Sequence, residues 1–126
     1  AALQSEIDAT ALAAAASPSL AGYAQQLKAA AAQLGAATSA AWATGSADEA
    51  LANATPYLQA FGHVVIAWMW LSVATIAVRA VDDAAQRGRL AACRYFFAYE
   101  LPKIAAWLGV VERRDDTCRT LAEESF

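Results

Sequence analysis

The fifteen residues from Val64 to Val78 carry no formal charge, and this run constrains the fold more than any other feature of the sequence. A helix that is apolar on all sides belongs either in lipid or at the centre of a packed protein. At 1.5 Å per residue the run covers about 22 Å, whereas the hydrocarbon core of a bilayer is about 30 Å thick. Extending it backward admits Gln59 and His63, and extending it forward meets Arg79 at once. We therefore expect the central helix of a soluble bundle, with a membrane span as the alternative.

The composition favours an all-α fold. Alanine supplies 36 of the 126 residues, whereas glycine and proline together supply nine, and alanine is the strongest helix former. A chain of this length fits one domain and buries roughly two-thirds of the surface that its unfolded form exposes. Such a domain needs neither a disulfide nor a metal ion to hold its core.

Helical periodicity predicts an antiparallel bundle of three long helices with short terminal helices. The first long helix should cover residues 18–43. The second should cover residues 46–87, with a kink at Pro56 and an end at Gly88. The third should cover residues 89–109 and carry the most regular apolar pattern of the sequence. That pattern consists of Leu90, Cys93, Phe97, Leu101, Ile104 and Leu108.

The two ends of the chain give weaker signals. Residues 1–16 are predicted to be a linker or a short helix, and residues 17–126 to be the bundle domain. Within the charged tail, Asp115 or Asp116 should cap a last short helix. Pro102, inside the third long helix, should bend that helix because it lacks an N–H group.

Charge is distributed unevenly along the chain. Residues 1–78 carry five charged side chains, whereas residues 79–126 carry sixteen, eight of each sign. The net charge of −3 argues against a nucleic-acid partner, which would require a basic face. A first half so poor in charge should be covered by lipid, by another subunit or by a further domain of the same chain. The chain starts with alanine and contains only one methionine, Met69, which suits a fragment of a longer protein.

The only histidine, His63, lies directly before the apolar run. A metal pair on a helix needs a carboxylate or a second histidine three or four residues away. The residues at those positions are Gln59, Ala60, Ile66 and Ala67. We therefore favour a structural histidine over a ligand or catalytic role.

Two charged residues of the third predicted helix are further candidates for a functional role. Glu100 precedes Lys103 by three residues, and we expect it to form an ion pair or to bond a backbone donor freed by the proline. Glu100 could also meet His63 across the bundle. Arg94 lies beside the apolar seam and either binds an anion or an acidic partner, or is a solvated or salt-bridged arginine.

The remaining reactive side chains form no recognisable site. The pairs Asp82-Asp83 and Asp115-Asp116 are interpreted as solvated helix ends, because adjacent residues do not face one another on a helix. Cys93 and Cys118 form no CxxC motif and are interpreted as reduced thiols of a cytosolic protein. No glycine-rich phosphate loop and no nucleophile with an adjacent base is present. We assign no catalytic, cofactor-binding or metal-binding residue to this chain.

Two stretches resemble a known family, the C-terminal helical domain of the large bacterial acyl-CoA dehydrogenases, often described as acetyl-CoA dehydrogenase C-terminal-like. This group includes the 3-methylmercaptopropionyl-CoA dehydrogenases. The first matching stretch contains Asn53, Pro56, Tyr57, Leu58, Phe61, Gly62, Val64, Val65 and Trp68. The second contains Gly88, Leu90, Ala91, Ala92, Phe96, Phe97, Glu100, Leu101 and Pro102. With the preceding helix, the resemblance covers residues 18–110.

The resemblance implies a parent flavoprotein that binds FAD and removes two hydrogens across the Cα–Cβ bond of an acyl-CoA. In that family a glutamate base and the flavin belong to upstream core domains, so FAD is implied for the parent and not for this fragment. The implied role here is packing and assembly: contact with the core domains of the same chain and support of a homodimer. The implied setting is cytoplasmic fatty acid metabolism, without a membrane span or nucleic acid. The alternative is an independent helical binding protein with an apolar pocket near Trp68, Trp70 and Phe97.

Overall fold

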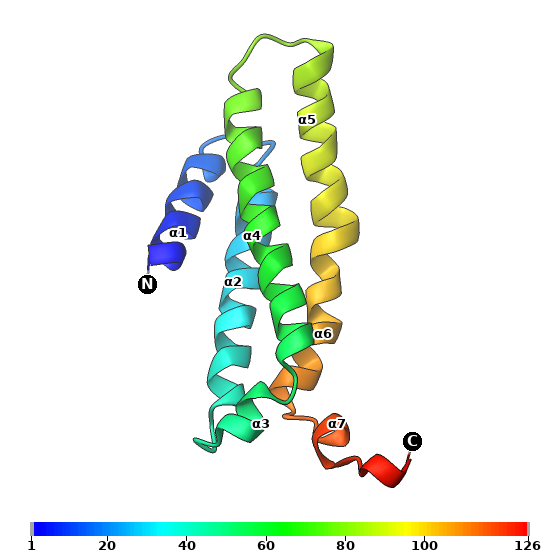
Figure 1. The fold of residues 1–126 in the computed structure, drawn as a ribbon. Coiled ribbons are helices and arrows are strands. Elements are labelled where there is room, and N and C mark those ends of the chain that lie inside the picture. Colours follow the sequence, from blue (N-terminus) through cyan, green and yellow to red (C-terminus); the bar gives the residue numbers. More distant parts are fainter. Residues whose placement is uncertain (1, 126) are drawn as a thin grey trace.

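The computed structural model describes residues 2–125 and, within that range, consists of helices and their connections without a strand (Figure 1). The α-helices are α1 (Ala2–Ala15), α2 (Ala21–Ala41), α3 (Ala47–Leu51), α4 (Ala54–Ala77), α5 (Ala84–Tyr95), α6 (Ile104–Glu112) and α7 (Thr117–Thr120). A π-helical segment, Phe96–Glu100, and a 3-10 turn, Leu101–Lys103, join α5 to α6, and another 3-10 turn covers Glu123–Ser125. The predicted all-α fold is confirmed. Residues 1 and 126, the outer limits of the predicted terminal segments, lie outside the described residues.

Helix α4 lies at the centre of an antiparallel bundle. It packs against α1, α2, α5 and α6, and the successive long helices alternate in direction (Figure 1). Burial of one large apolar side chain contributes roughly 1.5–3 kcal/mol, so a few such residues dominate the stability of the core. The largest fully buried side chains are Leu27, Val64, Leu71, Cys93 and Leu108.

The inner face of α4 explains how one helix contacts four others. Its buried residues recur every three or four positions, which keeps them on one side of the helix. They are Ala60, Val64, Ala67, Leu71, Ala74 and Ala77. Alanine alternates with a larger side chain along much of this face, and the small residues let neighbouring helices approach closely. The apolar run is therefore the central helix of a bundle, as predicted.

The prediction of one continuous helix over residues 46–87 is wrong, because the chain breaks twice in that range. The first break, at Ala52 and Asn53, separates α3 from α4. Pro56 does not kink a longer helix but lies in the first turn of α4, where a missing N–H group leaves no helical hydrogen bond unmade. The Asn53 side chain fixes this junction by donating a 2.9 Å hydrogen bond to the carbonyl oxygen of Asp115.

The second break covers residues 78–83 and shows that the helix end predicted at Gly88 is also wrong. The Asp83 backbone is extended, and its carboxylate accepts a 2.9 Å hydrogen bond from the backbone N–H of Gln86. This N-cap starts α5, because it satisfies a donor that has no partner within the helix. Gly88 therefore lies inside α5 instead of ending α4.

The predicted helix 89–109 corresponds to a longer and less regular element. It comprises α5, the π-helical segment, the 3-10 turn and α6. Where Pro102 was expected to bend the helix, the chain departs from α-helical geometry over residues 96–103. Proline lacks the N–H group that would bond to Ala98, so the hydrogen-bond pattern changes on both sides of it.

Helix α1 shows which of the two alternatives for residues 1–16 holds in the described part: residues 2–15 are helical. Its buried side chains are Ile7, Ala11 and Ala14. Toward α4, Thr10 accepts a 2.8 Å hydrogen bond from the indole Nε1 of Trp68. Helix α1 is thus packed against the bundle rather than extended from it.

Helix α2 (Ala21–Ala41) is shorter than the helix predicted over residues 18–43, and α7 (Thr117–Thr120) ends before Glu124, where the last short helix was expected to end. Helix α2 starts at Ala21 rather than residue 18, because the carbonyl oxygen of Ser17 accepts a 2.9 Å hydrogen bond from Leu20 in a preceding turn. In the tail, the Asp115 carboxylate accepts a 3.1 Å hydrogen bond from the backbone N–H of Thr117, directly before the single turn of α7.

Candidate functional site

A cluster of polar side chains connects α4 to the π-helical segment. Nε2 of His63 lies 3.1 Å from Oε2 of Glu100, so the predicted meeting of these residues across the bundle is confirmed. The Lys103 ammonium donates to both carboxylate oxygens of Glu100 at 2.9 Å. Hydrogen bonds from Lys103, and next from His63, hold the pKa of the Glu100 carboxyl below its ordinary value. The His63 and Glu100 side chains are 21% and 26% exposed.

The ring of His63 is held at both nitrogen atoms. Its Nδ1 lies 3.1 Å from the carbonyl oxygen of Gln59, and this oxygen, like the Glu100 carboxylate, can only accept a hydrogen bond. Both ring nitrogen atoms therefore lie against protein oxygen atoms, which fixes the orientation of the imidazole. The rings of Trp107 and Phe96 lie 4.7 and 5.6 Å from the imidazole, centroid to centroid. The cluster therefore joins α4 to the segment that follows α5.

Two members of this cluster were missed from the sequence. Trp107 lies four residues after Lys103, and that helical spacing was an available signal. The contact with the Gln59 carbonyl group has no signal in the sequence, because any residue would offer the same backbone oxygen.

The other titratable side chains lie apart from this cluster. No three histidine, cysteine, aspartate or glutamate side chains among residues 2–125 are grouped so that they could hold a metal ion. Asp82 accepts a 2.9 Å hydrogen bond from Arg87, while Asp83 caps α5, so both serve the helix start. Cys93 and Cys118 are free thiols. Cys93 is fully buried, and burial raises its pKa to about 11, which keeps it unreactive.

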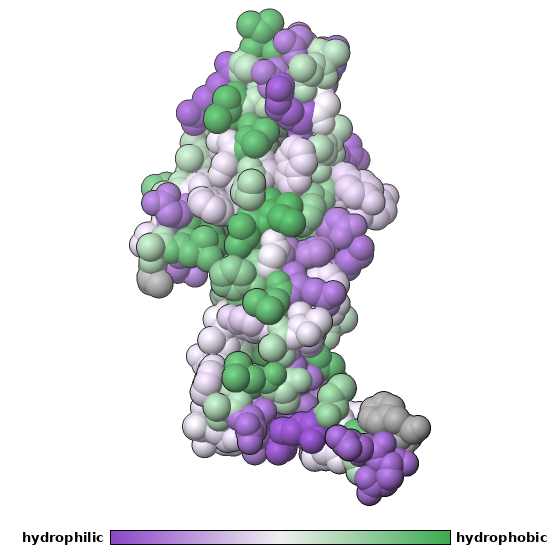
Figure 2. Space-filling view, in the orientation of Figure 1, coloured by the Kyte–Doolittle hydropathy of each residue, from purple (hydrophilic) through white to green (hydrophobic). Residues whose placement is uncertain are grey.

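The outward face of α4 carries large apolar side chains. We call Leu58, Ile66, Met69 and Ile76 the outer stripe; they are 65%, 41%, 56% and 72% exposed. Hydrophobic side chains gather along this face of the molecule, over α4 (Figure 2). Monomeric proteins expose single apolar residues commonly but extended apolar patches rarely, so this row of four exposed side chains on one helix face is unusual.

Helix α4 also has the length and composition of a membrane span. Its most apolar window of 18 residues has a mean hydropathy of 1.7, and 33% of that window is buried. The core helix of a soluble protein passes the same test. The packing of α4 against four other helices accounts for its inner face, and the outer stripe remains to be explained.

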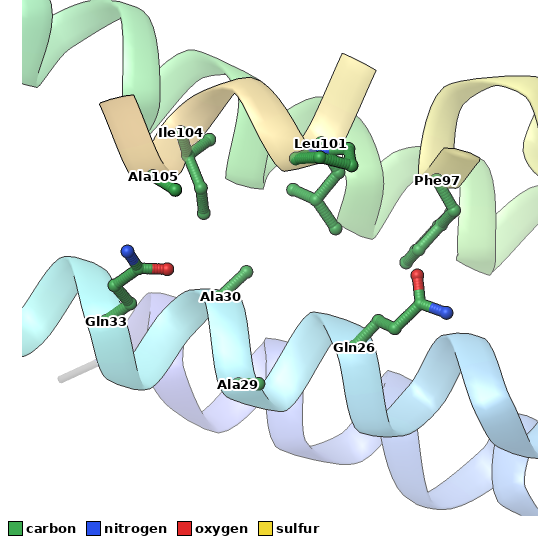
Figure 3. Close-up of a pocket in the computed structure, with 9 residues that line it drawn as sticks. Gln26, Ala29, Ala30, Gln33, Phe97, Leu101, Ile104 and Ala105 are labelled. Atoms are coloured by element: carbon green, nitrogen blue, oxygen red, sulfur yellow. The ribbon is translucent and has the colours of Figure 1, made fainter. Parts of the chain in front are cut away.

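A groove lies between α2 and the chain that follows α5, with a cavity of about 330 Å³. Gln26 and Gln33 of α2 stand toward its two ends (Figure 3). From the opposite side, apolar side chains point toward Ala30 of α2 (Figure 3). These apolar side chains are Phe97, Leu101 and Ile104.

The two cavities that Phe97 lines are not lined by Trp68 or Trp70, which the prediction had placed beside it. At 3.6 residues per turn, Trp68 and Trp70 point about 200° apart around α4. Trp68 bonds to α1 through Thr10. Phe97 instead lies 5.0 Å from the ring of Tyr23 on α2, centroid to centroid.

Arg94 is exposed and makes no ion pair or side-chain hydrogen bond with any residue in the range 2–125. It lies beside Tyr23 and Phe97, where the groove continues beyond the cavity of Figure 3. A salt-bridged arginine therefore finds no support among the described residues, whereas a solvated arginine and one that binds an anion or an acidic partner both fit its exposure.

Comparison with known protein families gives one finding. The family model described as acetyl-CoA dehydrogenase C-terminal like matches residues 3–122, which is nearly the whole chain. Searches of curated proteins and of solved structures gave no significant match.

Proposed function

Because the chain belongs to the acetyl-CoA dehydrogenase C-terminal-like family, we propose that it is the C-terminal packing and assembly domain of an FAD-dependent acyl-CoA dehydrogenase. The parent enzyme oxidises the Cα–Cβ bond of an acyl-CoA in cytoplasmic fatty acid metabolism. The catalytic base and the flavin belong to its core domains, and this domain performs no chemical step. Its partners are those core domains and the second subunit of a homodimer.

The outer stripe of α4 is the observation that supports this role. Its four side chains lie on the solvent side of a helix whose opposite side is already buried in the bundle. Covering a large apolar side chain contributes roughly 1.5–3 kcal/mol, so contact with another protein surface would be favourable. Residues 54–78 contain no aspartate, glutamate, lysine or arginine side chain that would have to be desolvated when such a surface is covered.

The groove beside α2 does not fit a flavin cofactor. A bound dinucleotide needs backbone N–H groups or cations that converge on its diphosphate. The groove beside α2 offers one cation, Arg94, and is otherwise lined by uncharged residues. We therefore assign flavin binding to the core domains.

The test uses the full-length dehydrogenase with Met69→Lys, which places an ammonium group on the outer stripe. Burying an unpaired charge costs more than the 1.4 kcal/mol that corresponds to a factor of ten. We expect the dimer dissociation constant to rise about tenfold or more, measured by analytical ultracentrifugation, with a parallel loss of dehydrogenase activity. Helix content should not change, because Met69 is 56% exposed in this domain.

Leu12→Lys is the matched control. Leu12 is 77% exposed on α1 and lies outside the outer stripe, so the same change of charge should leave assembly unaltered. Equal association by the Met69 and Leu12 variants would contradict the assembly role. Flavin bound by this domain alone would contradict the assignment of the cofactor to the core domains.

A further inference from the structure

The groove beside α2 is longer than the cavity in Figure 3. That cavity, of about 330 Å³, shares Gln26 and Phe97 with a neighbouring cavity of about 200 Å³. The second cavity shares Tyr23 and Arg94 with a third of about 320 Å³. We call these three adjoining cavities the α2 groove; they lie mainly between α2 and residues 90–105. Beyond the third lies a cavity of about 260 Å³ that is also lined by Asp82 and Arg87, and these two side chains pair with each other at 2.9 Å.

Arg94 is the only charged residue among those that line the α2 groove. Its guanidinium group has no acidic partner among residues 2–125. The rest of the lining consists of apolar side chains with serine, tyrosine and two glutamines. A lone cation beside an apolar surface is complementary to an amphipathic molecule with a carboxylate near one end.

The shape of the groove favours a helix over a small molecule. Small ligands are usually buried over most of their surface, whereas this groove is largely open along its length. It runs from Ser19, in the turn before α2, along α2 to Gln33, and the part from Ala21 to Gln33 is about 18 Å long at the rise of a helix, which a helix of about four turns would cover. Ala29 and Ala105 face it with small side chains, so another helix backbone can approach closely.

The direction of the flanking helices sets the direction of the occupant. Tyr23 and Arg94 line one part of the groove, while Gln33 and Ala105 line another, so α2 and the chain from α5 to α6 run the same way. An occupant helix that runs antiparallel to α2 and to the chain from α5 to α6 has its macrodipole opposite to theirs, which is favourable. Its negative C-terminal end then lies at Arg94.

We propose that the α2 groove binds an amphipathic helix of a partner protein, with a carboxylate of its last turn on Arg94. Apolar side chains of that helix, spaced at three and four residues, cover Ala29, Ala30 and Leu101. This interaction goes beyond the proposed assembly role and does not depend on it, because the α2 groove and the outer stripe share no residue.

The probe is a synthetic helical peptide of about 16 residues, long enough for four turns, with leucines at three- and four-residue spacing. It carries one glutamate in its last turn and alanine and glutamine at the other positions. A fluorescent label on the peptide allows its binding to the full chain to be followed by fluorescence anisotropy. We expect saturable binding that weakens about tenfold in Arg94→Gln. Replacing the peptide glutamate by glutamine should cause the same loss, and combining both changes should add little more. A lysine peptide should bind better to Arg94→Glu than to the unchanged chain.

Matched variants separate the groove from the rest of the surface. Ala105→Gln fills the groove and should reduce binding, whereas Ala106→Gln, also exposed on α6 but outside the lining, should not. Arg89→Gln removes a charge outside the groove lining and should leave binding unchanged. Circular dichroism checks that each variant keeps its helices.

Absence of saturable peptide binding, or an equal loss of peptide affinity in Ala105→Gln and Ala106→Gln, overturns the inference. Met69→Lys should bind the peptide normally, which distinguishes this result from failure of the assembly role.

Discussion

Glu100 couples the stability of the domain to pH. Hydrogen bonds from Lys103 and His63 lower the pKa of its carboxyl group in the folded state. A carboxyl whose pKa is lowered by folding stabilises the fold above its unfolded pKa. This contribution is lost as the pH falls from the ordinary value of 4.5 through the lowered folded value.

Glu100→Gln should therefore flatten the acidic part of the stability profile. Glutamine keeps an oxygen acceptor but does not titrate. The variant should therefore be less stable than the unchanged chain near neutral pH, and its free energy of unfolding should fall less than that of the unchanged chain as the pH drops below about 4.5. Urea midpoints measured across this range give the two profiles. Glu112→Gln makes the same change of charge at an exposed position outside the cluster. If the Glu100 and Glu112 variants showed the same pH profile, the cluster would have no special role.

At the scale of the elements, periodicity located the helices but did not set their limits. The apolar spacing of α4 and of residues 90–108 follows from burial, and burial is visible in the sequence. The break before α5 depends on a side chain that bonds to one backbone group, at Asp83. The pattern Asp83 to Gln86 was a usable capping signal, but Gly88 carried a competing signal for a helix end.

The cap at Asp83 makes a prediction about α5. Asp83→Ala removes the acceptor for the Gln86 N–H and should lower the free energy of unfolding by about 1 kcal/mol, measured by urea denaturation. Asp82→Ala is the control, because it removes an ion pair to Arg87 whose side chains are 61% and 83% exposed. Exposed pairs contribute at most about 1 kcal/mol and often nothing measurable, so this variant should differ little from the unchanged chain. Equal losses in both variants would show that the cap does not define the helix start.

At the scale of the whole molecule, the sequence predicted the bundle and only part of its sites. Alanine content, two amphipathic stretches and one run that is apolar on all sides sufficed for an antiparallel all-α fold. The meeting of His63 with Glu100 across the bundle was foreseen as one possibility. The separation of Trp68 from Phe97 was not foreseen, since it depends on how each helix is rotated about its axis. Rotation is set by packing among several helices at once, and no single stretch encodes it.

The two faces of α4 allow the bundle and the membrane span to be distinguished by one pair of variants. Ala67 is fully buried in the bundle, whereas Met69 is 56% exposed. In a bundle, Ala67→Lys places an unpaired charge in the core and should lower the free energy of unfolding by several kcal/mol. Met69→Lys should change it by about 0.5 kcal/mol or less. In a lipid span both lysines would lie in hydrocarbon and cost a similar roughly 2.5–3.5 kcal/mol. Urea denaturation of the chain without detergent should show a large loss of unfolding free energy for Ala67→Lys and not for Met69→Lys. Equal losses of unfolding free energy in the two variants, or a chain that is recovered only in membranes, would contradict the bundle.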